Sequence, residues 1–170
     1  MTARRPLAGL AAELGRLDAD ELPFVAQIDV RAEPSAAEAL GFPSRPNTTS
    51  PWRHADVLWL GPDEWLIVAQ PGRVPELLDT LGTALGSTHH SVVDVSANRA
   101  VFEMRAPDRY VRLAIACPLD LHPRSWGPWR CAQTVFGSAP VMLQERDDAT
   151  RVFVRPSFAA YVISLLDSPL

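Results

Sequence analysis

The sequence contains no lysine, so all sixteen of its basic residues are arginines. Without lysine there is no phosphate-binding P-loop, no Schiff-base nucleophile and no protein-kinase active site, because each of these needs that amine. The nine glycines include no GxGxxG pattern, which excludes a Rossmann dinucleotide loop. These absences remove several large classes of nucleotide-dependent enzyme.

Strong charge and long apolar runs are also missing. The net charge of -4 is spread along the chain without blocks, which gives no basic surface for nucleic acid. No apolar stretch reaches the length that spans a bilayer, and Glu13 and Arg16 interrupt the run that a signal peptide would need. We therefore expect a cytoplasmic protein with no membrane or nucleic-acid partner, whose two cysteines are reduced thiols.

What the sequence does contain is a consistent α+β pattern, centred on residues 91–124. Residues 91–95 and 100–105 are predicted strands, and a helix is predicted to begin at Pro107 and to end at Cys117-Pro118. With 47% hydrophobic residues over 170 positions, the chain can bury a substantial core. These signals indicate a folded domain rather than a linker.

The order of elements is similar in the two halves of the chain. A strand leads into a helix at Pro34 and again at Pro107, and a hairpin followed by another helix comes next in both halves. This order predicts two ferredoxin-like βαββαβ units with antiparallel sheets and helices on one face. We expect an N-terminal arm at residues 1–21 and a single α+β domain at 22–170, built from half-repeats of about 22–95 and 96–170.

Several further local predictions can be checked against a structure. A hairpin is expected over residues 57–69, turning at Gly61-Pro62-Asp63, and a helix over 74–85. Residues 42–52 are rich in proline and polar residues and predict a surface loop. Ser157 is a candidate N-cap for the last helix.

The cysteines and histidines offer two possible sites, a metal centre and a nucleophile pair. Cys117, His122 and Cys131 with His89 or His90 fit no CxxC or HxxxH spacing, so no metal site is predicted. A Cys117/His122 nucleophile pair is disfavoured too, since a cysteine before proline at a helix end is usually a small buried residue.

Carboxylates and tryptophans give the remaining candidates. Asp94 and Asp120 are typical of turns closed by their own side chains, so no catalytic residue is predicted, with Asp120 the only candidate. Trp59 and Trp65 lie in predicted strands and are expected in the core. The other tryptophans fall in predicted loops beside arginines, as interface anchors often do. The predicted partner-facing residues are Trp52, Arg53, Arg124, Trp126 and Trp129.

A family resemblance covers nearly the whole chain. Its motifs are LWLGPDEWLIVA (58–69), SVVDVS (91–96), ACPLDLHPR (116–124), CAQT (131–134) and VRPSFAAY (154–161). The sequence resembles the gamma subunit of heterotetrameric sarcosine oxidase. That resemblance implies a complex that demethylates sarcosine oxidatively to glycine, using O2 and tetrahydrofolate.

The resemblance also implies where the chemistry lies. In such a complex the alpha and beta subunits hold FAD, FMN, NAD and the tetrahydrofolate site, and the delta subunit carries zinc. The gamma chain has no cofactor of its own, which implies a non-catalytic role in structure and assembly.

A more distant resemblance concerns the folate-binding domain of the glycine-cleavage T-protein, an aminomethyltransferase. The order VVDVS, strand, Ala-Pro-Asp, helix and Leu119-Asp120-Leu121 is similar, with Asp120 at the position of a catalytic aspartate. Here Leu119 replaces the family's asparagine and residues 97–100 replace its His-Met-Gly. The alternatives are thus an autonomous folate-binding or aminomethyltransferase-like protein, using Asp120, Arg124 and the Trp126/Trp129 loop, or the equivalent subunit of a related N-methyl amino acid oxidase or dehydrogenase.

Overall fold

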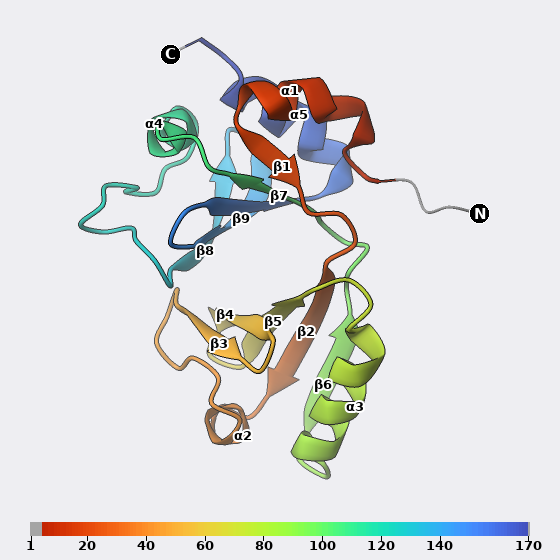
Figure 1. The fold of residues 1–170 in the computed structure, drawn as a ribbon. Coiled ribbons are helices and arrows are strands. Elements are labelled where there is room, and N and C mark those ends of the chain that lie inside the picture. Colours follow the sequence, from red (N-terminus) through yellow and green to blue (C-terminus); the bar gives the residue numbers. More distant parts are fainter. Residues whose placement is uncertain (1–4, 170) are drawn as a thin grey trace. The chain divides into compact units, whose positions relative to one another are not determined.

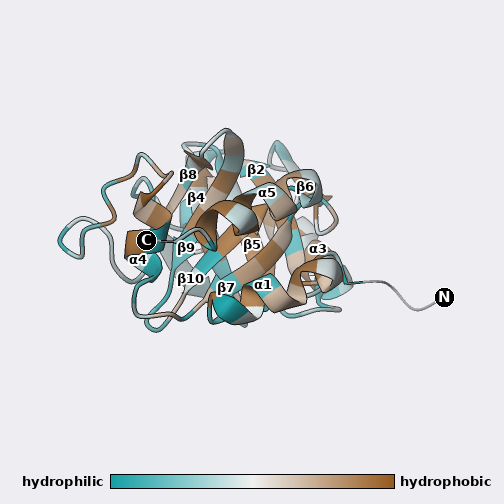
Figure 2. Ribbon diagram, turned by 90° about the horizontal axis from the view of Figure 1, so that it is seen from above, coloured by the Kyte–Doolittle hydropathy of each residue, from teal (hydrophilic) through white to brown (hydrophobic). Residues whose placement is uncertain are grey.

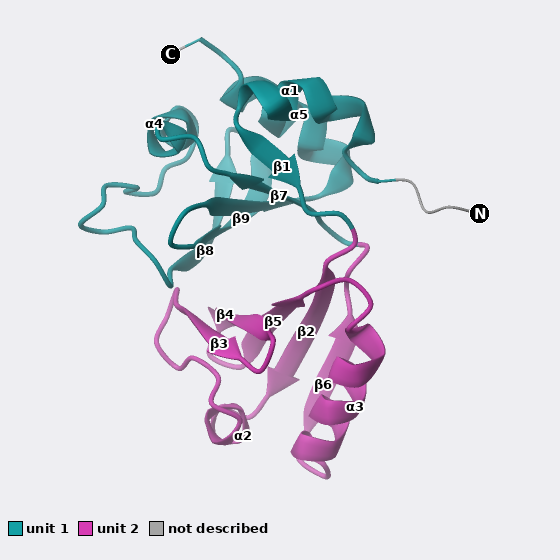
Figure 3. Cartoon of the chain, in the orientation of Figure 1, with its two compact units in different colours: residues 1–23, 98–170 teal, residues 24–97 magenta. Residues whose placement is uncertain are grey.

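The structure, a computed structural model, describes residues 5–169. The chain divides into two compact units, one formed by residues 24–97 (unit 2) and one by residues 1–23 with 98–170 (unit 1; Figure 3). Each unit has one five-stranded sheet in which every strand pairing is antiparallel, and each has its own hydrophobic core. The predicted α+β class with antiparallel sheets is confirmed.

Unit 2 runs in the order strand, helix, three strands, helix, strand (Figure 1). Its elements are β2 (Ala26–Ala32), α2 (Pro34–Ala39), β3 (Thr49–Trp52), β4 (Ala55–Gly61), β5 (Glu64–Ala69), α3 (Val74–Leu85) and β6 (His90–Asp94). The sheet order is β3-β4-β5-β2-β6. Without β3 this is the ferredoxin-like arrangement, so unit 2 is a βαββαβ unit with an additional strand at the edge.

The core of unit 2 follows from two apolar patterns. The last five residues of β5 are all buried, and most of the strand is coloured as apolar in Figure 2. Helix α3 has the predicted bounds and buries Leu77, Leu81 and Leu85, which share one face because they are four residues apart. The hairpin turn predicted at Gly61-Pro62-Asp63 joins β4 to β5 and is confirmed.

One segment of unit 2 differs from the prediction. Residues 42–52 were expected to form a loop, but Thr49–Trp52 is strand β3, paired with β4 from Thr49↔Leu58 to Trp52↔Ala55. Pro51 argued against a strand because proline cannot donate to a sheet ladder. The strand tolerates it because β3 lies at the sheet edge, where one side of the backbone needs no partner.

Unit 1 repeats this topology with one change of connection. Its elements are a 3-10 helix (Ala8–Leu10), α1 (Ala11–Arg16), β1 (Ala19–Glu21), β7 (Ala100–Met104), α4 (Arg109–Ala114), β8 (Cys131–Phe136), β9 (Ala139–Glu145), β10 (Thr150–Val154) and α5 (Pro156–Leu166). The sheet order is β1-β7-β10-β9-β8. The edge strand that pairs with β7 is therefore β1, which comes from the N-terminal segment.

The N-terminal segment is part of a core rather than a separate arm over its described length. Leu7, Leu14 and Leu17 are buried in the core of unit 1, and β1 pairs with β7 from Ala19↔Met104 onward. The sequence shows the leucine spacing but not the partner that would bury it, which is why residues 1–21 were set apart. Residues 1–4 of that predicted arm lie outside the described residues.

Candidate functional site

The sequence-predicted candidates gather in the α4–β8 loop of unit 1, residues 115–130. Asp120 closes a turn there: its Oδ1 accepts the backbone N–H of His122 at 3.0 Å, and its Oδ2 accepts the hydroxyl of Ser125 at 2.6 Å. The backbone N–H of Arg124 donates to Nδ1 of His122 at 3.2 Å. Both carboxylate oxygens of Asp120 thus hold the loop's own conformation.

The electrostatics of Asp120 agree with this structural role. The hydroxyl of Ser125, and then the backbone amide of His122, hold the pKa of the Asp120 carboxyl below its ordinary value of 3.8. A general base works best when its pKa is near the operating pH, so this shift makes Asp120 a poorer proton acceptor. The arrangement orders a turn and does not prepare a base.

Trp126, predicted to face a partner, is instead a core residue of unit 1. Its side chain is 5% exposed, and its Nε1 donates to Oε2 of Glu145 at 2.9 Å. A buried indole N–H needs a hydrogen-bond acceptor, and Glu145 at the end of β9 provides it for Trp126. The prediction of an exposed anchor at Trp126 is therefore wrong.

Glu145, which the sequence analysis did not single out, is the most connected polar residue of this region. It is 1% exposed and accepts hydrogen bonds from Tyr110 Oη at 2.7 Å and Thr150 Oγ1 at 2.6 Å. Arg109 Nη2 lies 3.2 Å away and forms an ion pair with it. Helix α4, the α4–β8 loop and strands β9 and β10 therefore converge on one buried carboxylate.

The same network affects Tyr110. Burial, and then its hydrogen bond to the Glu145 carboxylate, raise the pKa of the Tyr110 phenol above its ordinary value of 10.0. The phenol therefore stays protonated and donates to Glu145 throughout the physiological range. Nothing in the sequence marks Glu145, because a glutamate at a strand end is ordinarily exposed.

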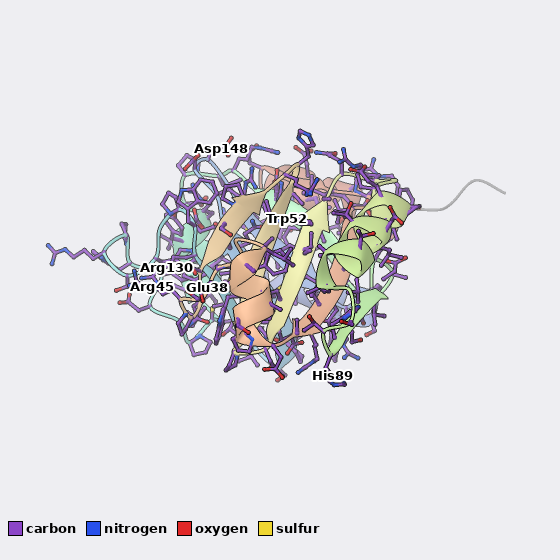
Figure 4. All side chains as sticks on the ribbon, turned by 90° about the horizontal axis from the view of Figure 1, so that it is seen from below. Glu38, Arg45, Trp52, His89, Arg130 and Asp148 are labelled. Atoms are coloured by element: carbon purple, nitrogen blue, oxygen red, sulfur yellow. The ribbon has the colours of Figure 1, made fainter. Side chains whose placement is uncertain are left out.

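In unit 2, the predicted pair Trp52 and Arg53 divides between core and surface. Trp52, labelled in Figure 4, is 9% exposed and meets Phe42 edge to face at a ring-centroid distance of 5.4 Å. The guanidinium of Arg53 lies 5.3 Å from the Trp52 ring centroid and is exposed. Trp52 is thus another wrong prediction of an exposed anchor, since the unexpected strand β3 turns it inward.

Three of the predicted partner-facing residues do present exposed side chains. They are Arg53, Arg124 and Trp129, and Trp129 is 48% exposed. Both Arg53 and Trp129 have positive φ, at 54° and 68°. Such angles cost energy in residues with a Cβ, so the surrounding structure holds these two positions in place.

Comparison with known proteins identifies the family. The pattern of the sarcosine oxidase, gamma subunit family matches residues 37–169. Sarcosine oxidase subunit gamma of Corynebacterium sp. (strain U-96) is 36% identical over 156 residues, which cover 86% of this chain and 75% of the relative. The chain belongs to the sarcosine oxidase gamma subunit family.

Other gamma-subunit relatives and solved structures agree. The protein of Corynebacterium sp. (strain P-1) is 35% identical over 89% of this chain and 79% of its own. The family's fold is seen in the heterotetrameric sarcosine oxidase of Corynebacterium sp. U-96, solved in complex with pyrrole 2-carboxylate. One of its chains matches 97% of this chain and 93% of its own, at 34% identity and a TM-score of 0.85.

The more distant structural likeness concerns the fold alone. The glycine cleavage system aminomethyltransferase T of Bartonella henselae matches 95% of this gamma-subunit family chain and 49% of its own, at 12% identity and a TM-score of 0.65. The chain thus has the fold of part of an aminomethyltransferase. Such a likeness carries no function by itself.

The cysteines and histidines considered as metal ligands are divided between the two units of this family member. Cys117 and Cys131 are both buried and are not joined in a disulfide, and Cys117 Sγ lies 3.8 Å from Thr134 Oγ1. His122 is exposed in unit 1, whereas His89 and His90 lie in unit 2. Across residues 5–169, no three side chains of His, Cys, Asp or Glu are grouped as metal ligands. Over the same residues, no helix has the length and apolar character needed to cross a bilayer.

Proposed function

We propose that this chain is the gamma subunit of a heterotetrameric sarcosine oxidase and that it serves assembly rather than the chemical step. The observation that carries the proposal is the match to the U-96 enzyme, which extends over nearly the full length of both chains. The likeness is therefore to the subunit as a whole and not to one shared module. The complex would demethylate sarcosine to glycine with O2 and tetrahydrofolate.

The proposed partners are the alpha, beta and delta subunits of the same complex, in the cytoplasm. They would hold FAD, FMN, NAD, tetrahydrofolate and zinc. The non-catalytic role of this chain is supported by Glu145, which is 1% exposed and accepts hydrogen bonds from internal donors, and by Asp120, whose lowered pKa makes it a poorer proton acceptor. A catalytic carboxylate needs an oxygen available to the substrate.

The residues proposed to meet the partners are Arg53 in unit 2 and, separately, Arg124 and Trp129 in unit 1. Arginine and tryptophan are the residue types most enriched among interface residues that contribute strongly to binding. We expect Trp129→Ala to weaken assembly by about 2 kcal/mol, the size of a typical hot spot.

Co-expression with the alpha, beta and delta subunits of the same organism tests the proposal. A tag on the alpha subunit should recover this chain in equal amount, and the purified complex should consume O2 with sarcosine. Asp120→Asn should leave turnover per FAD unchanged, because the residue acts on the loop alone. If the chain stays in the unbound fraction while the other subunits associate, the proposed role is wrong.

A titration of the isolated chain with tetrahydrofolate addresses the autonomous alternative. We expect no heat of binding, since the fold alone is shared with the aminomethyltransferase. Micromolar binding that Asp120→Asn abolishes would instead assign a working folate site to this chain. A co-expressed complex that oxidises another N-methyl amino acid in preference to sarcosine would support the related-oxidase alternative.

A further inference from the structure

Unit 2 contains a pocket of about 330 Å³ beside α2 that the proposed function leaves without a role. Its lining consists of four prolines, three aromatic residues, one serine and one carboxylate, all from residues 34–65. Proline and indole surfaces are large and apolar. A concave, mainly apolar site with one charged group is the usual form of a specific binding site.

The walls of this pocket are held rigidly. Trp65 is 2% exposed, and its Nε1 donates to the carbonyl oxygen of Pro43 at 2.9 Å. Phe42 is buried against it, with ring centroids 6.0 Å apart. The prolines have fixed φ angles and few rotamers. The pocket is therefore formed before anything binds, which lowers the entropic cost of binding.

Glu38 is the one ionisable residue in the lining, and it sets the charge of the ligand. Glu38, labelled in Figure 4, lies on α2 and is exposed. Within the part of the chain that the structure describes, no ion pair involves its carboxylate. An apolar side chain in the pocket would displace water from the Glu38 carboxylate and offer no hydrogen bond in its place. An anion would be repelled by the same carboxylate. A cation with an apolar stem satisfies both the walls and the charge.

We propose that this pocket receives an arginine side chain of a partner subunit, with its guanidinium at Glu38. The inference rests on the proposed gamma-subunit role, which supplies the partner. Arginine fits better than lysine because its planar, weakly hydrated head stacks on indole and proline surfaces and pairs with a carboxylate through two N–H groups. Trp59 and Pro46 provide the stacking walls.

Binding of the full-length chain to a preassembled complex of the other subunits, measured by biolayer interferometry, tests the pocket. Glu38→Arg should weaken the Kd at least tenfold, and Glu38→Gln by a smaller factor. The matched control is Asp79→Arg, which makes the same charge change at an exposed position of α3 outside the pocket. All three variants should keep the thermal midpoint of the wild-type chain, because both positions are exposed.

The outcomes separate the pocket from the proposed function. If wild type binds and Glu38→Arg binds equally well, the pocket inference is overturned while the gamma-subunit role stands. If wild type itself does not bind, both are overturned. Equal losses for Glu38→Arg and Asp79→Arg would reflect net charge and would also overturn the pocket.

A photo-crosslinking residue at Ser44, in the pocket lining, identifies the occupant directly. In the assembled complex, we expect crosslinks to a partner-subunit peptide that contains an arginine near the crosslinked position. A crosslinked peptide without arginine, or no crosslink in an assembled and active complex, would contradict the assignment.

Discussion

In unit 2 the edge strand beside β2 is β6, which follows in the same half of the chain; in unit 1 the equivalent strand beside β7 is β1, which precedes all the others. The two sheets otherwise correspond strand for strand, as β6-β2-β5-β4-β3 and β1-β7-β10-β9-β8. Unit 2 is therefore continuous in sequence. The five-stranded sheet of unit 1 is complete only when β1 of the N-terminal segment pairs with β7. Equal topology does not require equal connectivity.

The units also differ in how they hold the loop that follows α4 in unit 1 and α2 in unit 2. In unit 1 the loop tryptophan Trp126 donates to a buried charged group, Glu145. In unit 2 the strand tryptophan Trp65 donates to a loop carbonyl, that of Pro43, within an aromatic cluster. One loop depends on a buried ion pair and the other on apolar packing, so the two should respond differently to mutation and to pH.

The largest expected effect is at Glu145. Glu145→Ala removes the acceptor for four donors and leaves the half-buried Arg109 without its ion-pair partner, so unfolding should become easier by about 3–5 kcal/mol. Chemical denaturation gives the free energy, and hydrogen exchange should show the loss of protection in residues 115–130 but not in unit 2.

Glu76→Ala is the matched control for Glu145. It removes a carboxylate that pairs with Arg73 at 2.7 Å on the surface, where such pairs contribute at most about 1 kcal/mol. Comparable losses for the two variants would show that the Glu145 network is not the centre of unit 1.

The second prediction concerns the N-terminal segment. Leu17 is 0% exposed in the core of unit 1, so Leu17→Ala should cost about 2–5 kcal/mol by leaving a cavity. In limited proteolysis of this variant, unit 1 should be cleaved before unit 2. Leu10→Ala, at a partly buried neighbour, should cost less. A stability unchanged by Leu17→Ala would restore the view of residues 1–21 as a separate arm.

Much of the fold follows from local patterns. Helix α3 could be placed because its leucines recur at helical spacing, and the β4–β5 hairpin because its turn residues lie between two apolar runs. In both cases the whole signal lies within one short segment. Ser157 failed as an N-cap because Pro156 already begins α5, and its cap position is Arg155. The strand β1 could not be placed, since its partner β7 lies far along the chain and no local signal links them.

The candidate site was less predictable than the fold. Asp120 was identified as a turn residue, and its two hydrogen bonds confirm that interpretation. Trp52 and Trp126 were misplaced because both lie in irregular sequence, whereas burial depends on which distant strand the loop covers. Glu145 was missed for the same reason: its four donors come from separate elements, and their convergence is a property of tertiary structure alone.

The third prediction compares the two indole hydrogen bonds. Trp126→Phe removes a donor to a buried charged acceptor, worth about 1.5–3 kcal/mol, whereas Trp65→Phe removes a donor to a neutral carbonyl, worth about 0.5–1.5 kcal/mol. Phenylalanine keeps most of the apolar contact in both cases. Denaturation midpoints of the two variants test this order, and a larger loss in Trp65→Phe would reverse the proposed contrast between the loops.

The smallest effect is the acid response of the unit 1 loop. Because the folded-state pKa of Asp120 is depressed, its ionised form stabilises the turn. That stabilisation is fully present above the ordinary aspartate pKa of 3.8 and is lost as the pH falls through the lower folded value. The amide proton of His122, which donates to Asp120, should report this titration by NMR with a midpoint below 3.8.

A synthetic peptide of residues 118–127 provides the reference for that titration, since it has the same local sequence without the rest of unit 1. Its Asp120 should titrate at the ordinary value, and Ser125→Ala in the full chain should move the folded midpoint toward it, because the Ser125 hydroxyl is the largest cause of the shift. In Asp120→Asn the acid transition of the His122 amide should disappear. If Asp120 has the same titration midpoint in the chain and in the peptide, the turn does not depend on the charge of Asp120. The α4–β8 loop of unit 1 and the loop after α2 in unit 2 would then respond to acid in the same way.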